Sequence, residues 1–279
     1  MMTPMHSPTE PDLASTTNPR VKAVVRLRDR RERDRTGLTV VDGAREVRRA
    51  IEAGARIEEA FVHEPFLGGA DAGAALGLLR DRGVPVRRTT EPVFEKLAFG
   101  ARAEGIVAVV HVPGTALDDL VLPAEPLIVV VEGIEKPGNL GAVLRSADGA
   151  GADAVIAASP RTDLFNPNTI RASAGTAFVV PLAAAETDAV IAWLGARPIR
   201  VVAAHVDAPL PYTEADMRGP VAIVLGSEAD GLTGAWSVPG VTAVRLPMRG
   251  IADSLNVSVT AAVLLYEARR QRDSFAPPV

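Results

Sequence analysis

The stretch that decides the fold is residues 127–148, LIVVVEGIEKPGNLGAVLRSAD. Its first five residues form the continuous apolar run typical of a strand buried on both faces of a parallel sheet. A Pro-Gly turn follows, and a helix is expected to begin near Asn139. Apolar residues then recur at i, i+3, i+4 and i+7, which predicts one buried helical stripe: Leu140, Val143, Leu144 and Ala147. A buried strand, a turn and an amphipathic helix together indicate an α/β fold.

The same alternation continues downstream to the end of the chain. Further strands are predicted at 154–158, 199–204, 221–225 and 241–246, and helices at 139–150, 167–173, 188–195 and 254–272. We therefore predict that 127–279 forms a parallel sheet with helices on both faces. Such sheets bind ligands beyond the carboxyl ends of their strands.

Upstream, residues 18–111 predict a smaller α/β domain. Strands are expected at 38–41, 57–62, 84–88 and 106–111, and helices at 18–36, 46–53, 74–82 and 92–97. Residues 112–126 contain three prolines, one glycine and two aspartates, which is typical of a linker. Residues 1–17 are polar and lack the apolar core of a signal peptide, so we interpret them as a flexible tail of a cytoplasmic protein. The longest apolar runs are too short to span a membrane.

Composition excludes several kinds of site. The chain has no cysteine, which rules out disulfides, cysteine zinc sites, iron–sulfur clusters and a catalytic thiol. Its four histidines are scattered without metal-ligand spacing, so we predict no metal. The net charge is −4, yet 18–49 contains 11 Lys/Arg against 5 Asp/Glu. That surplus would attract a phosphate backbone, although a solvated helix with internal ion pairs explains the charges equally well.

Three segments contain candidate site residues. In the first, Arg145 points away from the buried stripe and is free to face a cleft at the edge of the sheet. The alternative is that Arg145 pairs with Asp148 one turn later, while Asn139 only caps the helix.

The second segment is residues 221–232, VAIVLGSEADGL. A strand enters a turn in which Gly226 and Gly231 flank Glu228. Glycines let the backbone approach a ligand closely, and the carboxylate is free to accept hydrogen bonds from a ligand or to hold an arginine. The alternative is a purely structural turn. It is no phosphate loop, because the Gly-Lys-Ser/Thr ending is missing.

The third segment is residues 244–259, VRLPMRGIADSLNVSV. A strand and an irregular loop precede a helix that we expect Ser254 to cap, with Asn256 in the first turn, away from the buried face. That buried face is predicted to consist of Leu255, Val259, Ala262, Val263 and Tyr266. The alternative for Asn256 is an ordinary surface residue.

Together and in this order, the three segments resemble the motifs of the SpoU/TrmH group of SPOUT methyltransferases. The matching residues are Asn139, Arg145, Gly226, Glu228, Gly231, Pro247, Met248, Ser254, Leu255, Asn256 and Ser258. The resemblance is weaker in the first domain, where residues 18–22 (NPRVK) and 41–43 (VDG) are similar to the RNA-substrate-binding domain of that family. Asp42 is a departure, since relatives often have Glu there.

The resemblance implies a fold and a chemistry that spacing alone does not. It implies a deep trefoil knot in the carboxyl-terminal domain, a homodimer packed through that domain, and transfer of a methyl group from S-adenosylmethionine to a ribose 2'-hydroxyl. The implied cofactor-binding residues are Leu225, Gly226, Gly231, Leu246, Met248, Ser254 and Leu255. The implied catalytic residues are Arg145, Asn139, Glu228, Ser254 and Asn256. RNA would contact Arg20, Lys22, Arg26 and Arg145.

The sizeable first domain resembles members that act on 23S ribosomal RNA, some of which confer resistance to antibiotics. A transfer RNA methyltransferase and an RNA-binding protein that has lost its chemistry are the alternatives. A nucleotide hydrolase on a doubly wound sheet is a weaker alternative, because the chain lacks a phosphate loop and a nucleophile–histidine pair.

Overall fold

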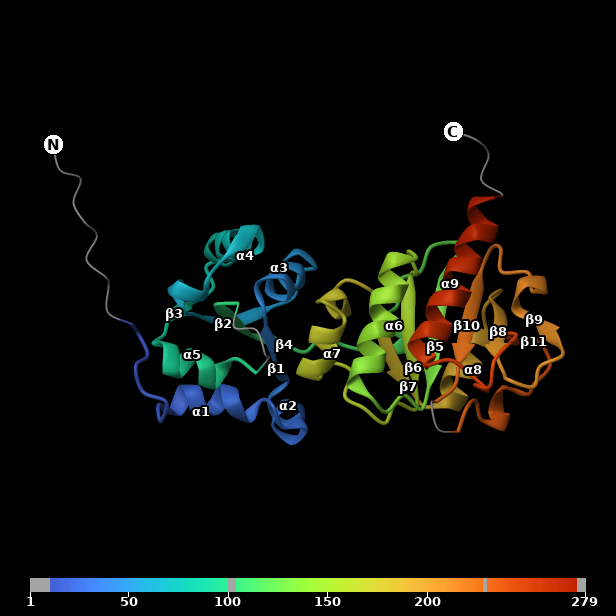
Figure 1. The fold of residues 1–279 in the computed structure, drawn as a ribbon, viewed down its shortest axis with the longest axis horizontal. Coiled ribbons are helices and arrows are strands. Elements are labelled where there is room, and N and C mark those ends of the chain that lie inside the picture. The colour runs from blue at the N-terminus through green and yellow to red at the C-terminus, as the bar shows by residue number, and fades with distance from the viewer. Residues whose placement is uncertain (1–10, 100–103, 228–229, 275–279) are drawn as a thin grey trace. The chain divides into compact units, whose positions relative to one another are not determined.

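The computed structural model describes residues 11–99, 104–227 and 230–274 (Figure 1). The chain divides into two compact units, with the boundary between Val112 and Pro113. The predicted linker therefore falls almost wholly in the second unit. It contains the short 3-10 helix η2 (Leu117–Asp119), and Leu117, Leu120 and Leu122 pack against the second unit's core.

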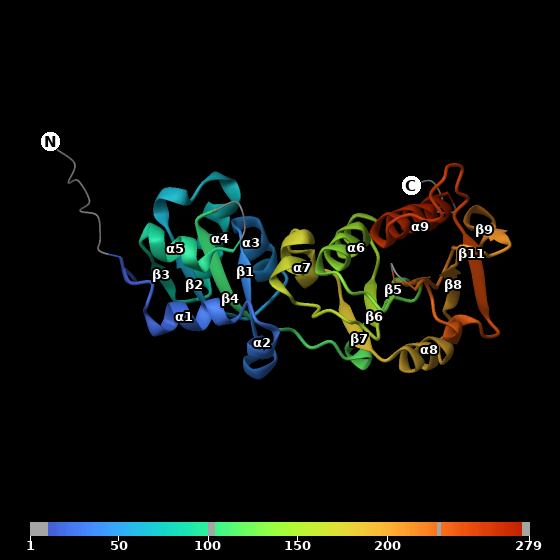
Figure 2. The ribbon, with the colours of Figure 1, turned by 60° about the horizontal axis from the view of Figure 1, so that its bottom comes forward.

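The first unit is a four-stranded sheet with helices on both faces (Figure 2). Its elements are α1 (Pro19–Arg26), α2 (Arg30–Thr36), β1 (Leu38–Asp42), α3 (Ala44–Glu52), β2 (Ile57–Val62), η1 (Glu64–Phe66), α4 (Gly69–Asp81), β3 (Val86–Arg88), α5 (Glu91–Leu97) and β4 (Ile106–His111). The strand order is β1-β4-β2-β3; β4 runs antiparallel to β1 and β2, and β3 is parallel to β2. Helices α1 and α5 share one core with alternate strand residues, while α3 and α4 pack together on the opposite face.

Residues 11–17 are part of this unit, so the predicted tail is wrong for them. Leu13 is buried beside α1 and α5. Its N–H donates to the carbonyl of Arg88, and its carbonyl accepts from the N–H of Thr90, which extends the sheet beyond β3. The sequence signal was weak because one leucine supplies the apolar contact. Residues 1–10 lie outside the described residues.

The basic stretch forms two helices where one was predicted. Asn18 caps α1 as expected, and Asp29 caps α2 by accepting from the N–H of Arg31 at 2.9 Å. Buried Arg33 donates to the carbonyls of Leu27 and Arg28, both at 2.8 Å. These carbonyls lie between α1 and α2, so Arg33 of α2 stabilises the break between the two helices.

The second unit is a seven-stranded, fully parallel sheet. The apolar runs predicted the parallel sheet and five of its strands. Its elements are β5 (Leu127–Glu132), α6 (Pro137–Gly149), β6 (Ala154–Ala158), α7 (Pro167–Ala172), η3 (Thr176–Phe178), β7 (Leu182–Ala185), α8 (Thr187–Gly195), β8 (Arg200–Ala204), β9 (Leu210–Pro211), η4 (Tyr212–Glu214), β10 (Val221–Leu225), η5 (Gly234–Trp236), β11 (Val241–Arg245) and α9 (Val257–Asp273). The strand order is β7-β6-β5-β10-β8-β11-β9. Strands β7 and β9 were not predicted, because an alanine run and a two-residue strand lack strand periodicity.

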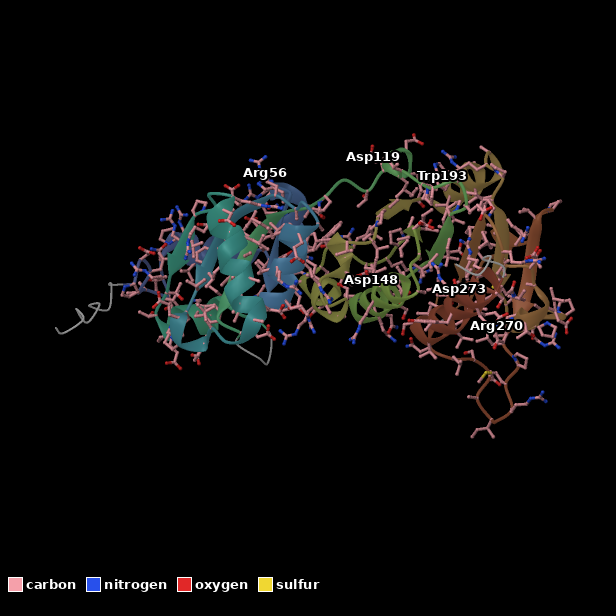
Figure 3. All side chains as sticks on the ribbon, turned by 90° about the horizontal axis from the view of Figure 1, so that it is seen from above. Arg56, Asp119, Asp148, Trp193, Arg270 and Asp273 are labelled. Carbon is pink, nitrogen blue, oxygen red and sulfur yellow. The ribbon has the colours of Figure 1, made fainter. Side chains whose placement is uncertain are left out.

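Helices cover both faces of this sheet. Figure 3 shows Trp193 of α8 on one face, and Asp148 of α6 and Asp273 of α9 on the other. Trp193 packs into a core with β-strand residues such as Ile156 and Val224. On the opposite face α6 and α9 lie side by side (Figure 2).

The register of α9 differs from the prediction. The helix begins at Val257, after Asn256, and its buried residues are Val257, Ala261, Leu264, Leu265 and Ala268. The predicted face is only partly covered: Leu255, Val259 and Tyr266 are 40%, 47% and 55% exposed. Both faces of α9 are apolar, so periodicity did not reveal which one meets the sheet.

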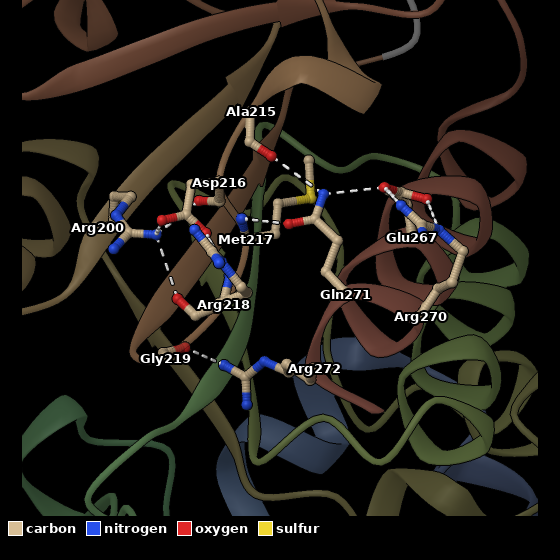
Figure 4. Close-up of polar contacts among 10 residues, drawn as sticks. All are labelled: Arg200, Ala215, Asp216, Met217, Arg218, Gly219, Glu267, Arg270, Gln271 and Arg272. Carbon is tan, nitrogen blue, oxygen red and sulfur yellow. Dashed lines mark hydrogen bonds and ion pairs between the residues drawn. The ribbon is translucent and has the colours of Figure 1, made fainter. Parts of the chain in front are cut away.

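The end of α9 is attached to the amino edge of the sheet (Figure 4). The Gln271 side chain accepts from the N–H of Met217 at 2.9 Å and donates to the carbonyl of Ala215 at 3.0 Å. The Arg272 guanidinium donates to the carbonyls of Pro126 and Gly219, just before β5 and β10. Burial lowers the pKa of Arg272. These contacts hold α9 against the starts of two central strands.

Candidate functional site

A cavity of about 360 Å³ opens at the carboxyl ends of β8, β10 and β11. Its size falls within the roughly 300–1,000 Å³ typical of small-molecule pockets. All seven residues predicted to bind a cofactor line it: Leu225, Gly226, Gly231, Leu246, Met248, Ser254 and Leu255. Residues of the second and third segments therefore line one cavity.

The turn after β10 forms part of the cavity wall. Ser227 and Gly231 exchange backbone hydrogen bonds of 3.0 and 3.2 Å, which close the turn. Gly231 has a φ of +69°, a conformation that glycine adopts without strain. A Cβ on Gly226 would lie less than 3.0 Å from backbone atoms of Gly231 and Leu232. Glycine is thus required at position 226 and favoured at position 231. Glu228, a predicted catalytic residue in this segment, lies outside the described residues.

The third segment supplies the cap of α9, but through a different residue than predicted. The Asn256 Oδ1 accepts from the N–H and the hydroxyl of Ser258, at 2.9 and 2.7 Å. Ser254 does not cap the helix and instead lines the cavity. The Asn256 Nδ2 donates to the Asn139 Oδ1 at 3.4 Å, a long hydrogen bond that connects the first and third segments. The two asparagines predicted to act together are therefore neighbours.

Arg145 is exposed on α6, opposite a stripe in which Leu140, Val143, Leu144 and Ala147 are all buried, as predicted. Among the residues that the structure describes, none forms an ion pair or hydrogen bond with its guanidinium, so the alternative pairing with Asp148 is absent there. Asn139 does not cap the helix either, since α6 begins at Pro137. Arg145 does not line the cavity, and its charge remains available to a ligand outside it.

Sequence reasoning missed several residues of this site. His205 follows β8 and lines the cavity with Val206, and Asp230 and Asp253 add two carboxylates to its wall. The position of His205, directly after a parallel strand, was a usable signal, because ligands bind at that edge. Asp230 is 3.6 Å from Arg161, which also pairs with Glu135. The Glu135 carboxylate raises the pKa of Arg161.

The residues of the first unit that are predicted to contact RNA differ in their ion pairs and in their exposure. Arg20 forms an ion pair with Glu59 on β2. Arg26 lies 3.7 Å from Glu32 and is largely exposed. Other arginines of the basic stretch are structural: Arg28, for example, donates to three carbonyls at the end of α5. Part of the positive surplus therefore stabilises the fold.

Among the residues that the structure describes, no three His, Asp or Glu side chains lie together in a group that could hold a metal ion. None of the helices in this described part of the chain has the length and apolar character needed to cross a membrane.

Comparison with known proteins covers both units. Residues 126–266 match the SpoU rRNA Methylase family, and residues 18–108 match the MRM3-like substrate binding domain. The 23S rRNA (guanosine-2'-O-)-methyltransferase RlmB of Vibrio parahaemolyticus is 34% identical over 226 residues, which cover 78% of this chain and 92% of that protein.

Solved structures are similar over nearly the whole chain. An RNA 2'-O ribose methyltransferase has a TM-score of 0.82 at 42% identity. The match covers 93% of this chain and 98% of the chain of that structure. The AdoMet-bound rRNA methyltransferase from Sinorhizobium meliloti has a TM-score of 0.83 at 30% identity, with the same coverage of 93% and 98%.

Proposed function

Because this chain belongs to the SpoU rRNA methylase family, we propose that it transfers a methyl group from S-adenosylmethionine to a ribose 2'-hydroxyl of 23S ribosomal RNA. The observation that carries the proposal is the convergence of all seven predicted cofactor residues on one cavity. A ribosomal RNA substrate agrees with a cytoplasmic site of action and with the substrate-binding family matched by residues 18–108.

The residues that line the cavity suit S-adenosylmethionine in polarity and charge. Leu246, Met248 and Leu255 provide an apolar surface for a purine ring. The absence of a side chain at Gly226 leaves backbone groups of the turn accessible to polar parts of the ligand. Asp230 and Asp253 would favour the positively charged sulfonium and amino groups.

Bound S-adenosylmethionine supplies an activated methyl group, so the protein must align the ribose oxygen and assist loss of its proton. Arginine essentially never deprotonates in proteins. We therefore assign Arg145 the task of binding a phosphate of the target nucleotide and polarising its 2'-hydroxyl, while the proton leaves through phosphate or water. Asn139, Ser254 and Asn256 would hold this geometry.

A trefoil knot is part of the proposal. Strand β10 lies between β5 and β8, and β11 lies beyond β8. Helix α9 follows β11 yet returns to pack on α6 and β10. This path supports threading of the carboxyl-terminal segment through a preceding loop, as the family resemblance implies.

We also propose a homodimer that packs through the exposed apolar face of α9. Val259, Val263 and Tyr266 recur at i, i+4 and i+7, and two of them are about half exposed. Apolar surface of this kind typically marks an interaction site. Replacing Val259 and Tyr266 with glutamate should convert a dimer to a monomer in analytical ultracentrifugation. Wild-type protein that sediments as a monomer would contradict this part of the proposal.

Methyl transfer from labelled S-adenosylmethionine to 23S rRNA, transfer RNA and a DNA control tests the proposed activity. Label on one ribose of 23S rRNA is the expected result, and mapping that nucleotide shows whether it lies at an antibiotic-binding position. Label on transfer RNA alone would establish the alternative substrate. Cofactor binding without label on naked or ribosomal RNA would favour the RNA-binding alternative that has lost its chemistry.

Arg145→Ala tests the catalytic assignment, with Asp148→Ala on the same exposed side of α6 as the matched control. We expect Arg145→Ala to slow methyl transfer by at least about 100-fold, the scale of assisted proton transfer, while cofactor affinity stays within about threefold. Asp148→Ala should leave both unchanged. A large loss of cofactor affinity in Arg145→Ala would refute the role given to Arg145.

Charge reversal at Lys22 and Arg26 tests RNA contact by the first unit. The affinity for 23S rRNA should fall, and its dependence on salt should become shallower, because fewer counterions are released. Unchanged affinity and an unchanged salt slope would contradict the assignment.

A further inference from the structure

Glu132 is the last residue of β5, and its side chain is buried, with 3% of its surface exposed. A buried carboxylate is stable only when its oxygens accept hydrogen bonds. Glu132 Oε2 accepts from the backbone N–H of Thr233 at 2.8 Å. Oε1 accepts from the hydroxyls of Thr233 at 2.9 Å and of Thr187 at 3.0 Å. Within the described ranges, no cation pairs with this carboxylate.

The two threonines belong to different parts of the fold. Thr187 begins α8, on the face of the sheet opposite α6 and α9. Thr233 comes two residues after Gly231, which closes the turn that lines the cavity. Both carboxylate oxygens contact Thr233, so Glu132 attaches the end of this turn to the central strand β5. Only Leu232 separates the attached residue from the cavity wall.

Two other contacts of the described residues of this turn are weaker attachments. The hydrogen bonds between Ser227 and Gly231 give the turn its shape but do not attach it to the sheet. Asp230 and Arg161 are 3.6 Å apart and both exposed. An exposed ion pair contributes little, whereas hydrogen bonds to a buried charge are among the stronger ones. Among the described residues, Glu132 therefore provides a buried attachment for the end of the turn.

We propose that Glu132 is a positioning residue for cofactor binding, which acts through Thr233 to hold Gly231 in place at the wall of the cavity. This inference rests on the proposed function, since the ligand is S-adenosylmethionine. Glu132 does not line the cavity. Its effect should therefore appear in cofactor affinity and in the stability of the turn.

Four variants of the full chain separate this role from general stability. Glu132→Ala removes the carboxylate that accepts the hydrogen bonds from Thr187 and Thr233. Glu132→Gln keeps an oxygen for the Thr233 N–H, and the two hydroxyls then accept from its amide, so it should rescue. Thr233→Val removes one contact to the turn. Thr187→Val is the matched control. It removes a hydrogen bond of similar length to the same carboxylate, but Thr187 belongs to α8 and not to the turn.

Titration with S-adenosylmethionine and hydrogen exchange of the Gly231 and Thr233 amides are the two readouts. We expect Glu132→Ala to weaken binding about 10- to 100-fold, the consequence of leaving buried donors without an acceptor, and to accelerate exchange of both amides. Thr233→Val should weaken binding severalfold. Glu132→Gln and Thr187→Val should stay within about threefold of wild type.

Equal losses of affinity in Thr187→Val and Thr233→Val would overturn the proposal, as would wild-type affinity and exchange in Glu132→Ala. If Glu132→Ala does not fold, the comparison of cofactor affinity between Thr187→Val and Thr233→Val decides whether Glu132 acts through Thr233. Wild-type protein that binds no S-adenosylmethionine would instead overturn the proposed function. The exchange rates would still decide whether Glu132 holds the turn.

Discussion

Replacing Gly226 with alanine tests how closely the turn after β10 is packed. The new Cβ would lie less than 3.0 Å from the backbone of Gly231 and Leu232, nearer than real Cβ atoms come. Backbone atoms cannot rotate away as a side chain does, so the turn must open. Overpacking of this kind costs about 1–3 kcal/mol. For a unit of this size, a loss of about 2 kcal/mol lowers Tm by roughly 4–8 °C.

The assay is thermal unfolding of the full chain, followed by titration with S-adenosylmethionine. Gly226→Ala should lower the Tm of the second unit and weaken cofactor binding at least about tenfold, since Gly226 lines the cavity. Gly234→Ala is the matched control, because no atom lies within 4 Å of its added Cβ. It should change neither readout. Gly226→Ala that melts and binds like wild type would refute the close packing on which the site rests.

Three other substitutions test separate parts of the fold. Asn256→Ala should destabilise α9 by about 0.5–2 kcal/mol in urea unfolding, whereas Asn256→Asp keeps the cap and loses only the donor to Asn139; equal destabilisation by both would contradict the capping role. Arg33→Met should destabilise the first unit by about 1–3 kcal/mol, because two carbonyls lose a buried donor; an unchanged unfolding midpoint would contradict this. The Arg218 side chain holds the pKa of Asp216 at about 2, below its usual 3.8, so the stabilisation is present above about pH 4 and lost as the pH falls to 2. Asp216→Asn should flatten stability across that pH range and cost less than about 1 kcal/mol at pH 7, because the pair is exposed and screened; an unchanged acid slope would disprove the assignment.

Local patterns were sufficient for the central strands, whereas the family resemblance indicated the residues that line the cavity. The continuous apolar runs of β5, β6 and β10 indicated buried parallel strands, because only a strand covered on both faces has no polar side. Gly226 and Gly231 were identifiable because a close backbone approach and a positive φ both favour glycine.

Patterns were insufficient where competing local signals had similar strength. Ser254 and Asn256 are both good capping residues, and the sequence favoured the wrong one. The apolar residues of α9 occupy two faces, and only packing against α6 and β10 distinguished the buried face from the exposed one. The basic stretch likewise did not show that Arg33 is buried as a helix cap.

The sequence by itself therefore determined the α/β class and the parallel sheet, since these follow from periodicity, and its motifs resembled those of a family whose site residues could be carried over. Only the tertiary structure decided which side chains meet. Glu132 and Thr233 are 101 positions apart, and Asn139 and Asn256 are 117 apart. Contacts at such separations depend on the order of strands in the sheet, which no local pattern encodes.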